Sequence, residues 1–147
     1  MTVATARPWP ATDSGGDLPR PGRVLVVDDD AEMRALLRRT LEFDGHEVSE
    51  LDRGTLVVET LRGAPFDLMI LDKEMPGMTG MDLLPILHRE FPQLPVVLIT
   101  AFGGRQVATT ALRLGATKYL EKPFRLGQLH DAIDGLISRP ADDSRAD

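Results

Sequence analysis

Six polar residues of this sequence each close a short apolar run or lie just after one. They are Asp28, Asp29, Asp30, Asp72, Thr100 and Lys122. Carboxylates that share one pole of a protein repel one another unless a cation lies among them. Oxygen ligands of this kind suit Mg²⁺, which takes one or two carboxylates together with water and phosphate oxygens. The aspartates therefore indicate a magnesium site.

A magnesium ion, a lysine and a hydroxyl group around one further carboxylate can support phosphoryl transfer, because positioning and charge neutralisation do most of the work in that reaction. Asp72 is then the nucleophile that becomes an aspartyl phosphate. Lys122 suits a compact charge on phosphate, and it is one of only 3 lysines beside 14 arginines. Asp30 is interpreted differently, as the N-cap of the helix that follows.

The elements around these residues have to bring them together. Short apolar or β-rich runs, typical of strands in a parallel sheet, alternate with amphipathic stretches of helical period. The predicted strands are 24–27, 46–51, 66–71, 96–100 and 117–120, and the predicted helices include 32–43, 81–91, 107–115 and 126–137. This order predicts an α/β fold with a doubly wound five-stranded parallel sheet, a flavodoxin-like three-layer sandwich. Ligands of such sheets bind beyond the carboxyl ends of the strands, where the six polar residues fall.

Pro85 lies inside the predicted helix at 81–91. Proline is tolerated in the first helical turn but deletes a backbone hydrogen bond further in. We therefore expect this helix to begin near Met81.

The length and composition fit one domain of 147 residues. We predict a flexible N-terminal extension at 1–22, a folded domain at 23–138 and a flexible C-terminal tail at 139–147. No apolar run approaches the roughly 18 to 20 residues of a membrane span, and the chain has no secretory h-region and no cysteine. A cytoplasmic location without membrane contact is predicted. The net charge of -6 argues against direct nucleic-acid binding.

Four motifs, VVDDD, ILDKEMPGMTG, LITAF and KYLEKPF, follow one another between about residues 23 and 138. In this order and spacing they resemble the receiver domain of bacterial two-component response regulators. The resemblance implies that Asp72 accepts phosphate from a sensor histidine kinase or a histidine phosphotransfer protein. It also implies that Asp29 binds Mg²⁺ directly, that Asp28 assists through water, and that Asp72 and the backbone carbonyl of Glu74 complete the protein ligands.

The resemblance further implies a conformational switch. Thr100 and Lys122 are expected to hold phosphoryl oxygens, and Tyr119 to report the switch as the fourth helix, the fifth strand and the fifth helix change. The peptide bond between Lys122 and Pro123 is expected to be cis.

Two side chains are expected to set the lifetime of the phosphorylated state, namely Glu74 and Phe102. The negative charge of Glu74 disfavours hydroxide-like attack by water, while the apolar ring of Phe102 screens the phosphoryl group from solvent. We expect the screen by Phe102 to have the larger effect.

Only about ten residues follow the last predicted helix, so the chain resembles the stand-alone, chemotaxis-type regulators. Such a domain is not an enzyme in its own right and assists only its own phosphorylation and dephosphorylation. It is expected to control a downstream protein, or to form a homodimer through its fourth and fifth helices and the strand between them. Whether it relays phosphate onward is left open by the sequence.

Three other functions fit these residues less well. A phosphatase of the haloacid dehalogenase type would carry a D-x-D-x-T motif, which neither DDDAE nor DKEMP provides. A nucleotide or flavin binder would need a glycine-rich or hydroxyl-rich turn after the first strand, where three carboxylates would repel phosphate. A receiver-like module that is not phosphorylated is expected to have lost acidic or lysine positions, and none is lost in this chain.

Overall fold

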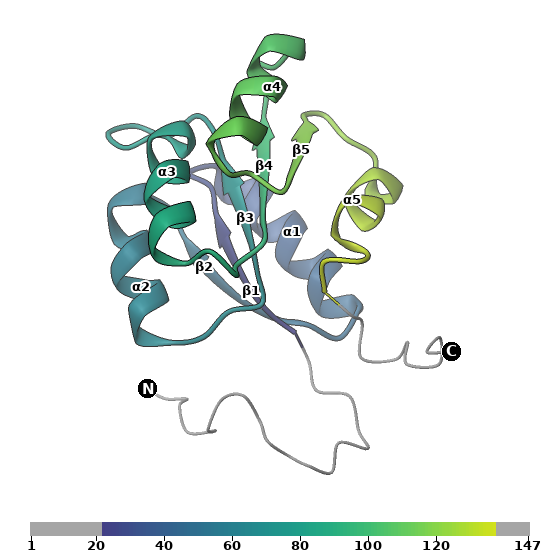
Figure 1. Ribbon diagram of the computed structural model, residues 1–147. Coiled ribbons are helices and arrows are strands. Elements are labelled where there is room, and N and C mark those ends of the chain that lie inside the picture. Colours follow the sequence, from purple (N-terminus) through teal and green to yellow (C-terminus); the bar gives the residue numbers. More distant parts are fainter. Residues whose placement is uncertain (1–21, 138–147) are drawn as a thin grey trace.

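The computed structural model describes residues 22–137. Apart from Gly22, the extension and the tail predicted at 1–22 and 139–147 lie outside this range. Strands and helices alternate along the chain (Figure 1). The strands are β1 (Arg23–Val27), β2 (Glu47–Leu51), β3 (Leu68–Asp72), β4 (Val96–Thr100) and β5 (Lys118–Glu121). The helices are α1 (Ala31–Phe43), α2 (Val57–Gly63), α3 (Gly80–Glu90), α4 (Arg105–Leu114) and α5 (Leu126–Ile133), with a 3-10 turn, η1 (Gly54–Leu56), before α2.

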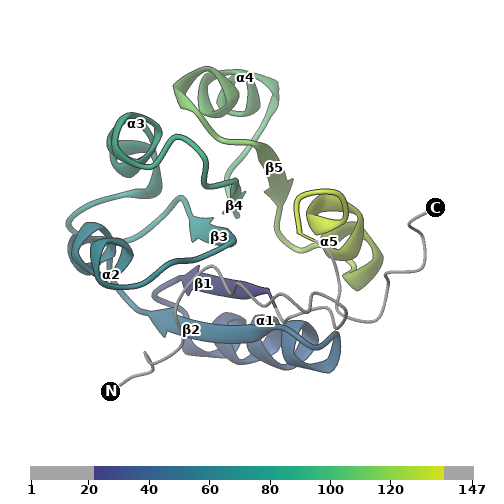
Figure 2. The ribbon, with the colours of Figure 1, turned by 60° about the horizontal axis from the view of Figure 1, so that its bottom comes forward.

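All five strands are parallel, and their order across the sheet is β2-β1-β3-β4-β5. The view in Figure 2 shows α1 and α5 on one face of the sheet and α2, α3 and α4 on the other. The strand order reverses between β1 and β3, and the crevice at such a switch point is where doubly wound sheets bind their ligands. The predicted three-layer α/β sandwich is confirmed.

Alternate residues of the central strands face opposite helix layers. In β1, Leu25 and Val27 belong to the apolar cluster under α2, α3 and α4, whereas Val24 and Val26 belong to the cluster under α1 and α5. All four side chains are fully buried. Burial of one such side chain contributes about 1.5–3 kcal/mol, and a shift of one residue would send each to the wrong layer. The core therefore fixes where each strand ends, and with it the position of Asp28.

The N-cap predicted for Asp30 is confirmed. Its carboxylate Oδ1 accepts hydrogen bonds from the backbone N–H groups of Glu32 at 3.0 Å and Met33 at 3.4 Å, in the first turn of α1. These bonds satisfy backbone donors that have no partner inside the helix. Asp30 thus has a structural role.

Helix α3 begins at Gly80, one residue before the expected start at Met81. A capping box explains the earlier start, because the Thr79 hydroxyl accepts from the Asp82 N–H and the Asp82 carboxylate accepts from the Thr79 N–H. Pro85 consequently lies beyond the first turn, where it deletes one backbone hydrogen bond. Its position is exposed, so water can replace the missing donor.

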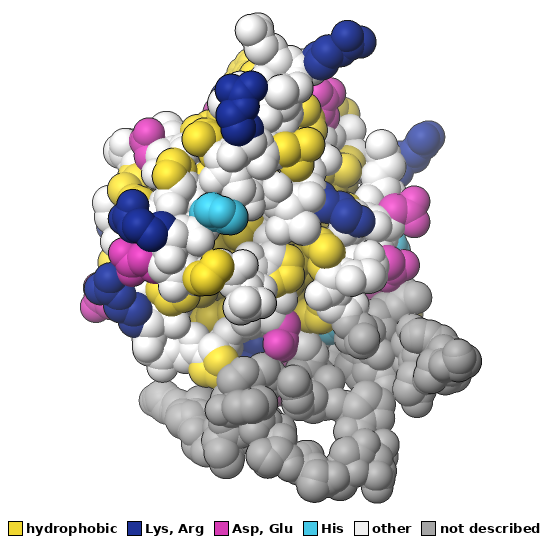
Figure 3. Space-filling view, viewed as in Figure 1, with side chains coloured by type: hydrophobic (Ala, Val, Ile, Leu, Met, Phe, Trp, Pro, Cys, Tyr) yellow, Lys and Arg dark blue, Asp and Glu magenta, His cyan; other side chains and the backbone are white. Residues whose placement is uncertain are grey.

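Within residues 22–137, no helix is long and apolar enough to cross a membrane. Figure 3 shows Lys and Arg side chains scattered over the face in view, among hydrophobic and acidic ones.

Candidate functional site

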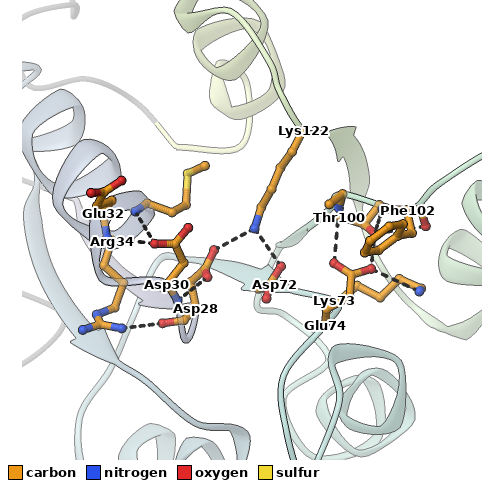
Figure 4. A network of polar contacts seen from close by, with 12 residues as sticks. Asp28, Asp30, Glu32, Arg34, Asp72, Lys73, Glu74, Thr100, Phe102 and Lys122 are labelled. Atoms are coloured by element: carbon orange, nitrogen blue, oxygen red, sulfur yellow. Dashed lines mark hydrogen bonds and ion pairs between the residues drawn. The ribbon is translucent and has the colours of Figure 1, made fainter.

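The carboxyl ends of β1, β3 and β5 bring two aspartates and a lysine together (Figure 4). Asp28 follows β1 and is 0% exposed, and Asp72 ends β3 and is 2% exposed. Lys122 follows β5, and its Nζ lies 3.3 Å from Asp28 Oδ2 and 3.1 Å from Asp72 Oδ1. The parallel register makes this possible, since Val27 of β1 lies opposite Leu71 of β3 and both strands end at the same edge. The lysine bridges both carboxylates.

One ammonium group does not compensate both buried carboxylates. The pKa of Asp72 is raised to about 6, first by burial and then by the charge of Asp28, although Lys122 opposes the rise. Burial also raises the pKa of Asp28, more than the Asp30 N–H and Lys122 lower it. Burial would lower the pKa of Lys122, but its bonds to Asp72 and Asp28 raise it overall. The cluster holds excess negative charge, which favours a bound cation.

Asp29 adds a third carboxylate from the solvent side. One oxygen each of Asp28, Asp29 and Asp72 lies within 4.8 Å of the other two. Two oxygens that share one Mg²⁺ at about 2.1 Å lie about 3 to 4 Å apart, so small side-chain movements would close the set. Asp29 and Glu74 line a cleft of about 450 Å³ beside the cluster, which gives water ligands access. The donor set, all oxygen and mostly anionic, fits a hard divalent cation.

Thr100 ends β4 and is fully buried beside the cluster. Its Oγ1 donates a hydrogen bond to Glu74 Oε2, and the Ala101 N–H donates to Glu74 Oε1 at 3.2 Å. Lys73 Nζ lies 3.3 Å from Glu74 Oε2. Burial would raise the pKa of Glu74, but the bonds from Thr100, Ala101 and Lys73 lower it overall. The Glu74 side chain is thus an anion held against the end of β4.

Tyr119 on β5 is half-buried, and its hydroxyl is bonded to the loop between β4 and α4. It donates to Glu121 Oε2 at 3.1 Å and accepts from the Gly104 N–H at 3.2 Å. The same Glu121 oxygen also accepts from the Gly104 N–H at 2.9 Å. A Cβ atom at Gly103 would lie 1.8 Å from the Tyr119 hydroxyl. The ring therefore lies against the loop that begins after Thr100, and glycine makes room for it.

The remaining predicted site residues lie around this centre. Figure 4 shows Phe102 beside Glu74 and Thr100, and the Phe102 side chain is 70% exposed. The Phe102 N–H donates to Thr100 Oγ1 at 2.9 Å, so its backbone helps to fix the threonine hydroxyl. The peptide bond between Lys122 and Pro123 is cis.

Arg34 is a residue of the site that the sequence prediction missed. Its Nη1 donates to the Asp28 backbone carbonyl at 2.7 Å, and its Nε lies 3.1 Å from Glu50 Oε1 on β2. The guanidinium therefore ties the end of β1 to its neighbouring strand. The sequence held a signal for Arg34, because the helix dipole disfavours a positive charge near the start of a helix. An arginine at this position therefore indicates a specific partner for its guanidinium. The contacts of Glu74 with Thr100 and Ala101 had no such signal.

Comparison with known proteins agrees with this architecture. The family described as the response regulator receiver domain matches residues 24–134. The response regulator protein FleR of Pseudomonas aeruginosa is 40% identical over 111 residues, which cover 76% of this chain and 24% of FleR. The response regulator protein TrrA of Thermotoga maritima, solved in complex with Mg²⁺ and BeF, is 28% identical with a TM-score of 0.72, covering 79% of this chain and 99% of that one. The beryllofluoride-activated NtrC4 receiver domain dimer is 28% identical with a TM-score of 0.74, and the match covers 78% of this chain and 94% of that one.

A flavodoxin-like sheet with aspartates and a lysine at its carboxyl edge is the architecture of a regulatory phosphoacceptor domain. The chain belongs to the response regulator receiver domain family of two-component systems. It spans about a quarter of the length of FleR.

Proposed function

We propose that Asp72 is the phosphoacceptor of a two-component signalling switch. The observation that carries this proposal is the position of the Asp72 carboxylate, which is buried at a strand end and shares the Lys122 ammonium with Asp28. Asp72 lies opposite Ile99 in the register of β3 and β4, so Thr100, the last residue of β4, lies at the same edge of the sheet. Nucleophile, cationic partner and hydroxyl donor thus share one edge of the sheet.

In the proposed reaction an Asp72 carboxylate oxygen attacks the phosphorus of a phosphohistidine on a sensor kinase or a histidine phosphotransfer protein. The phosphorus–nitrogen bond breaks, and the imidazole nitrogen keeps the electron pair. Lys122 neutralises charge on the phosphoryl oxygens from its position beside Asp72. Asp28, Asp29, Asp72 and the Glu74 backbone carbonyl would hold Mg²⁺, which when bound supplies further charge neutralisation at the phosphoryl group.

The phosphorylated state is proposed to signal through the face made by α4, β5 and α5. An aspartyl phosphate carries close to two negative charges, which attract the Thr100 hydroxyl and the Lys122 ammonium. A movement of Thr100 would alter the loop after β4, against which Tyr119 lies. The outcome would be binding to a downstream protein or homodimerisation. Because the NtrC4 receiver forms a dimer when activated, a dimer is one form that we propose to test. A cytoplasmic location stays a prediction from the sequence.

The test is mass spectrometry after incubation with acetyl phosphate and Mg²⁺. The wild type is expected to gain one base-labile phosphoryl group on Asp72, and Asp72→Asn none. Asp30→Asn is the matched control, because asparagine is an equally good N-cap and this variant should be labelled like the wild type. A label that maps to another residue, or persists in Asp72→Asn, would refute the assignment.

A further inference from the structure

The carboxylate of Glu74 occupies two hydrogen-bond donors at the end of β4. Its Oε2 accepts from the Thr100 hydroxyl and its Oε1 accepts from the Ala101 N–H at 3.2 Å. A planar anion with one oxygen on each of two adjacent donors has the geometry of a bound ligand rather than of a surface ion pair. Figure 4 shows the Glu74 side chain turned towards Thr100.

These donors lie where the product of the proposed reaction needs them. Asp72 is opposite Ile99 in the sheet, so Thr100, the last residue of β4, and Ala101, which follows it, lie at the same edge as Asp72. Thr100 is fully buried, and its hydroxyl has a single proton to donate. Two acceptors lie within reach of that proton, the Glu74 carboxylate and, at 3.1 Å, the Phe102 carbonyl, and the anion is the stronger acceptor. While Glu74 holds that proton, a phosphoryl oxygen on Asp72 cannot have it.

We propose that Glu74 is an internal anion that occupies the donors of Thr100 and Ala101 in the unphosphorylated protein and has to leave them before the switch can close. This inference rests on the proposed function and deepens it, since it names the contact that opposes phosphorylation. Release is sterically open, because the Glu74 side chain is 31% exposed and lines the cleft beside Asp29. Lys73, 3.3 Å from Glu74 Oε2, stabilises the blocked position.

The consequence for affinity follows from the fraction of molecules in which the donors are available. A protein whose binding-competent state is populated about a tenth of the time binds its ligand about tenfold more weakly than that state does. We expect a block of this order, because two hydrogen bonds to a carboxylate are exchanged for hydrogen bonds from water. The probe is beryllofluoride, which mimics a phosphoryl group and needs no chemical step.

Three variants separate the hydrogen bonds of Glu74 from its charge. Glu74→Ala removes both the bonds and the charge. Glu74→Asp keeps the charge but withdraws the carboxylate by about one carbon–carbon bond, roughly 1.5 Å, which breaks both contacts. Glu74→Gln removes the charge and keeps one acceptor oxygen. Glu59→Ala is the control for net charge, since Glu59 is an exposed carboxylate on α2 that is not one of the site residues.

The experiment has two measurements on the same samples by NMR. The first is amide hydrogen exchange at Ala101 without Mg²⁺ or any phosphoryl donor, which reports the contact directly. We expect faster exchange in Glu74→Ala and Glu74→Asp than in the wild type and in Glu59→Ala. The second is titration with beryllofluoride in saturating Mg²⁺, for which we expect both variants to bind about tenfold more tightly and Glu74→Gln to be intermediate.

The outcomes distinguish this inference from the proposed function. If the wild type binds beryllofluoride and Glu74→Ala and Glu74→Asp bind it no more tightly, the inference is overturned and the proposed function stands. If Glu74→Ala binds more tightly but Glu74→Asp equals the wild type, charge repulsion explains the effect and the hydrogen-bond block is wrong. If neither the wild type nor any variant binds beryllofluoride, or Asp72→Asn binds it equally well, the proposed function itself fails.

Discussion

Replacing Asp72 by asparagine is expected to stabilise the metal-free protein. Asparagine has nearly the same shape, and its carbonyl oxygen can still accept the hydrogen bond from Lys122, but it carries no charge. In the folded protein, burial and the charge of Asp28 raise the pKa of Asp72 from 3.8 to about 6. At about 1.36 kcal/mol per pKa unit, this rise lowers the free energy of unfolding by about 3 kcal/mol when the group is ionised. Asp72→Asn removes that penalty.

The direction of the pKa change fixes the sign of the pH dependence. A carboxyl group with a higher pKa in the folded state binds protons more tightly there, so it destabilises the fold where it is ionised. The penalty from Asp72 is complete above about pH 7, shrinks as the pH falls through about 6, and is lost below the unfolded value of 3.8. The stabilisation by Asp72→Asn should therefore be about 3 kcal/mol at pH 7.5 and about 1 kcal/mol at pH 4.5.

Urea unfolding followed by circular dichroism, in EDTA at both pH values, measures this difference. Asp30→Asn is the control, because it also removes one negative charge near the site but keeps the helix cap. It should stay within about 0.5 kcal/mol of the wild type at both pH values. Added Mg²⁺ should reduce the difference in free energy of unfolding between Asp72→Asn and the wild type at pH 7.5. The wild type keeps the Asp72 carboxylate and should bind Mg²⁺ more tightly, and a ligand of the native state stabilises the protein that binds it. The charge argument would be contradicted if the wild type and Asp72→Asn were equally stable at pH 7.5. It would also be contradicted if their free energies of unfolding differed by the same amount at pH 7.5 and pH 4.5.

Four further substitutions test other parts of the site. Asp29→Ala should weaken Mg²⁺ binding at least about tenfold, whereas Asp30→Ala should leave it nearly unchanged and cost about 1 kcal/mol of stability; equal losses in calorimetric titration would mean that the cluster is misassigned. Gly103→Ala should displace the ring of Tyr119, the single tyrosine of the chain, because the new Cβ would lie 1.8 Å from its hydroxyl; unchanged NMR signals of that ring would argue against the packing. Phe102→Ala should speed loss of phosphate several-fold, worth about 1 kcal/mol in the barrier; decay no faster than wild type after removal of the donor would refute the apolar screen.

The fold could be predicted because its strands carry a strong signal. Runs such as 96–99 are apolar at every position, which only a strand covered on both faces explains in a chain of this composition. The ends of the strands were harder to predict, because polar residues can lie inside a strand at its end. Strand β3 was expected at 66–71 and is found at Leu68–Asp72, because its last residue continues the ladder while serving the site. The helix α2 (Val57–Gly63) has only seven residues, too few for a clear helical period, and only the alternation of strands and helices required it.

The site could be predicted as far as strand ends decide it. Parallel strands deliver their carboxyl ends to one edge, so the convergence of Asp28, Asp72 and Lys122 follows from sequence order alone. Side-chain direction does not follow in the same way. The effect of the Glu74 charge on attack by water stays a prediction, whereas the hydrogen bond between its carboxylate and Thr100 was not predicted. That hydrogen bond depends on a rotamer and on a donor from another strand, which no local pattern in the sequence encodes.

The positive and hydrogen-donating groups at the edge of the sheet are already bonded to carboxylates of the chain. Lys122 is shared between Asp28 and Asp72, and Thr100 and Ala101 are held by Glu74. A phosphoryl group on Asp72 would therefore exchange partners rather than meet unused ones. Each exchange replaces one hydrogen bond to an anion by another, so the two arrangements differ by far less than the gross strength of their bonds. An equilibrium that is close to balance can be moved by the differential contacts of one small group, which is the physical requirement for a switch.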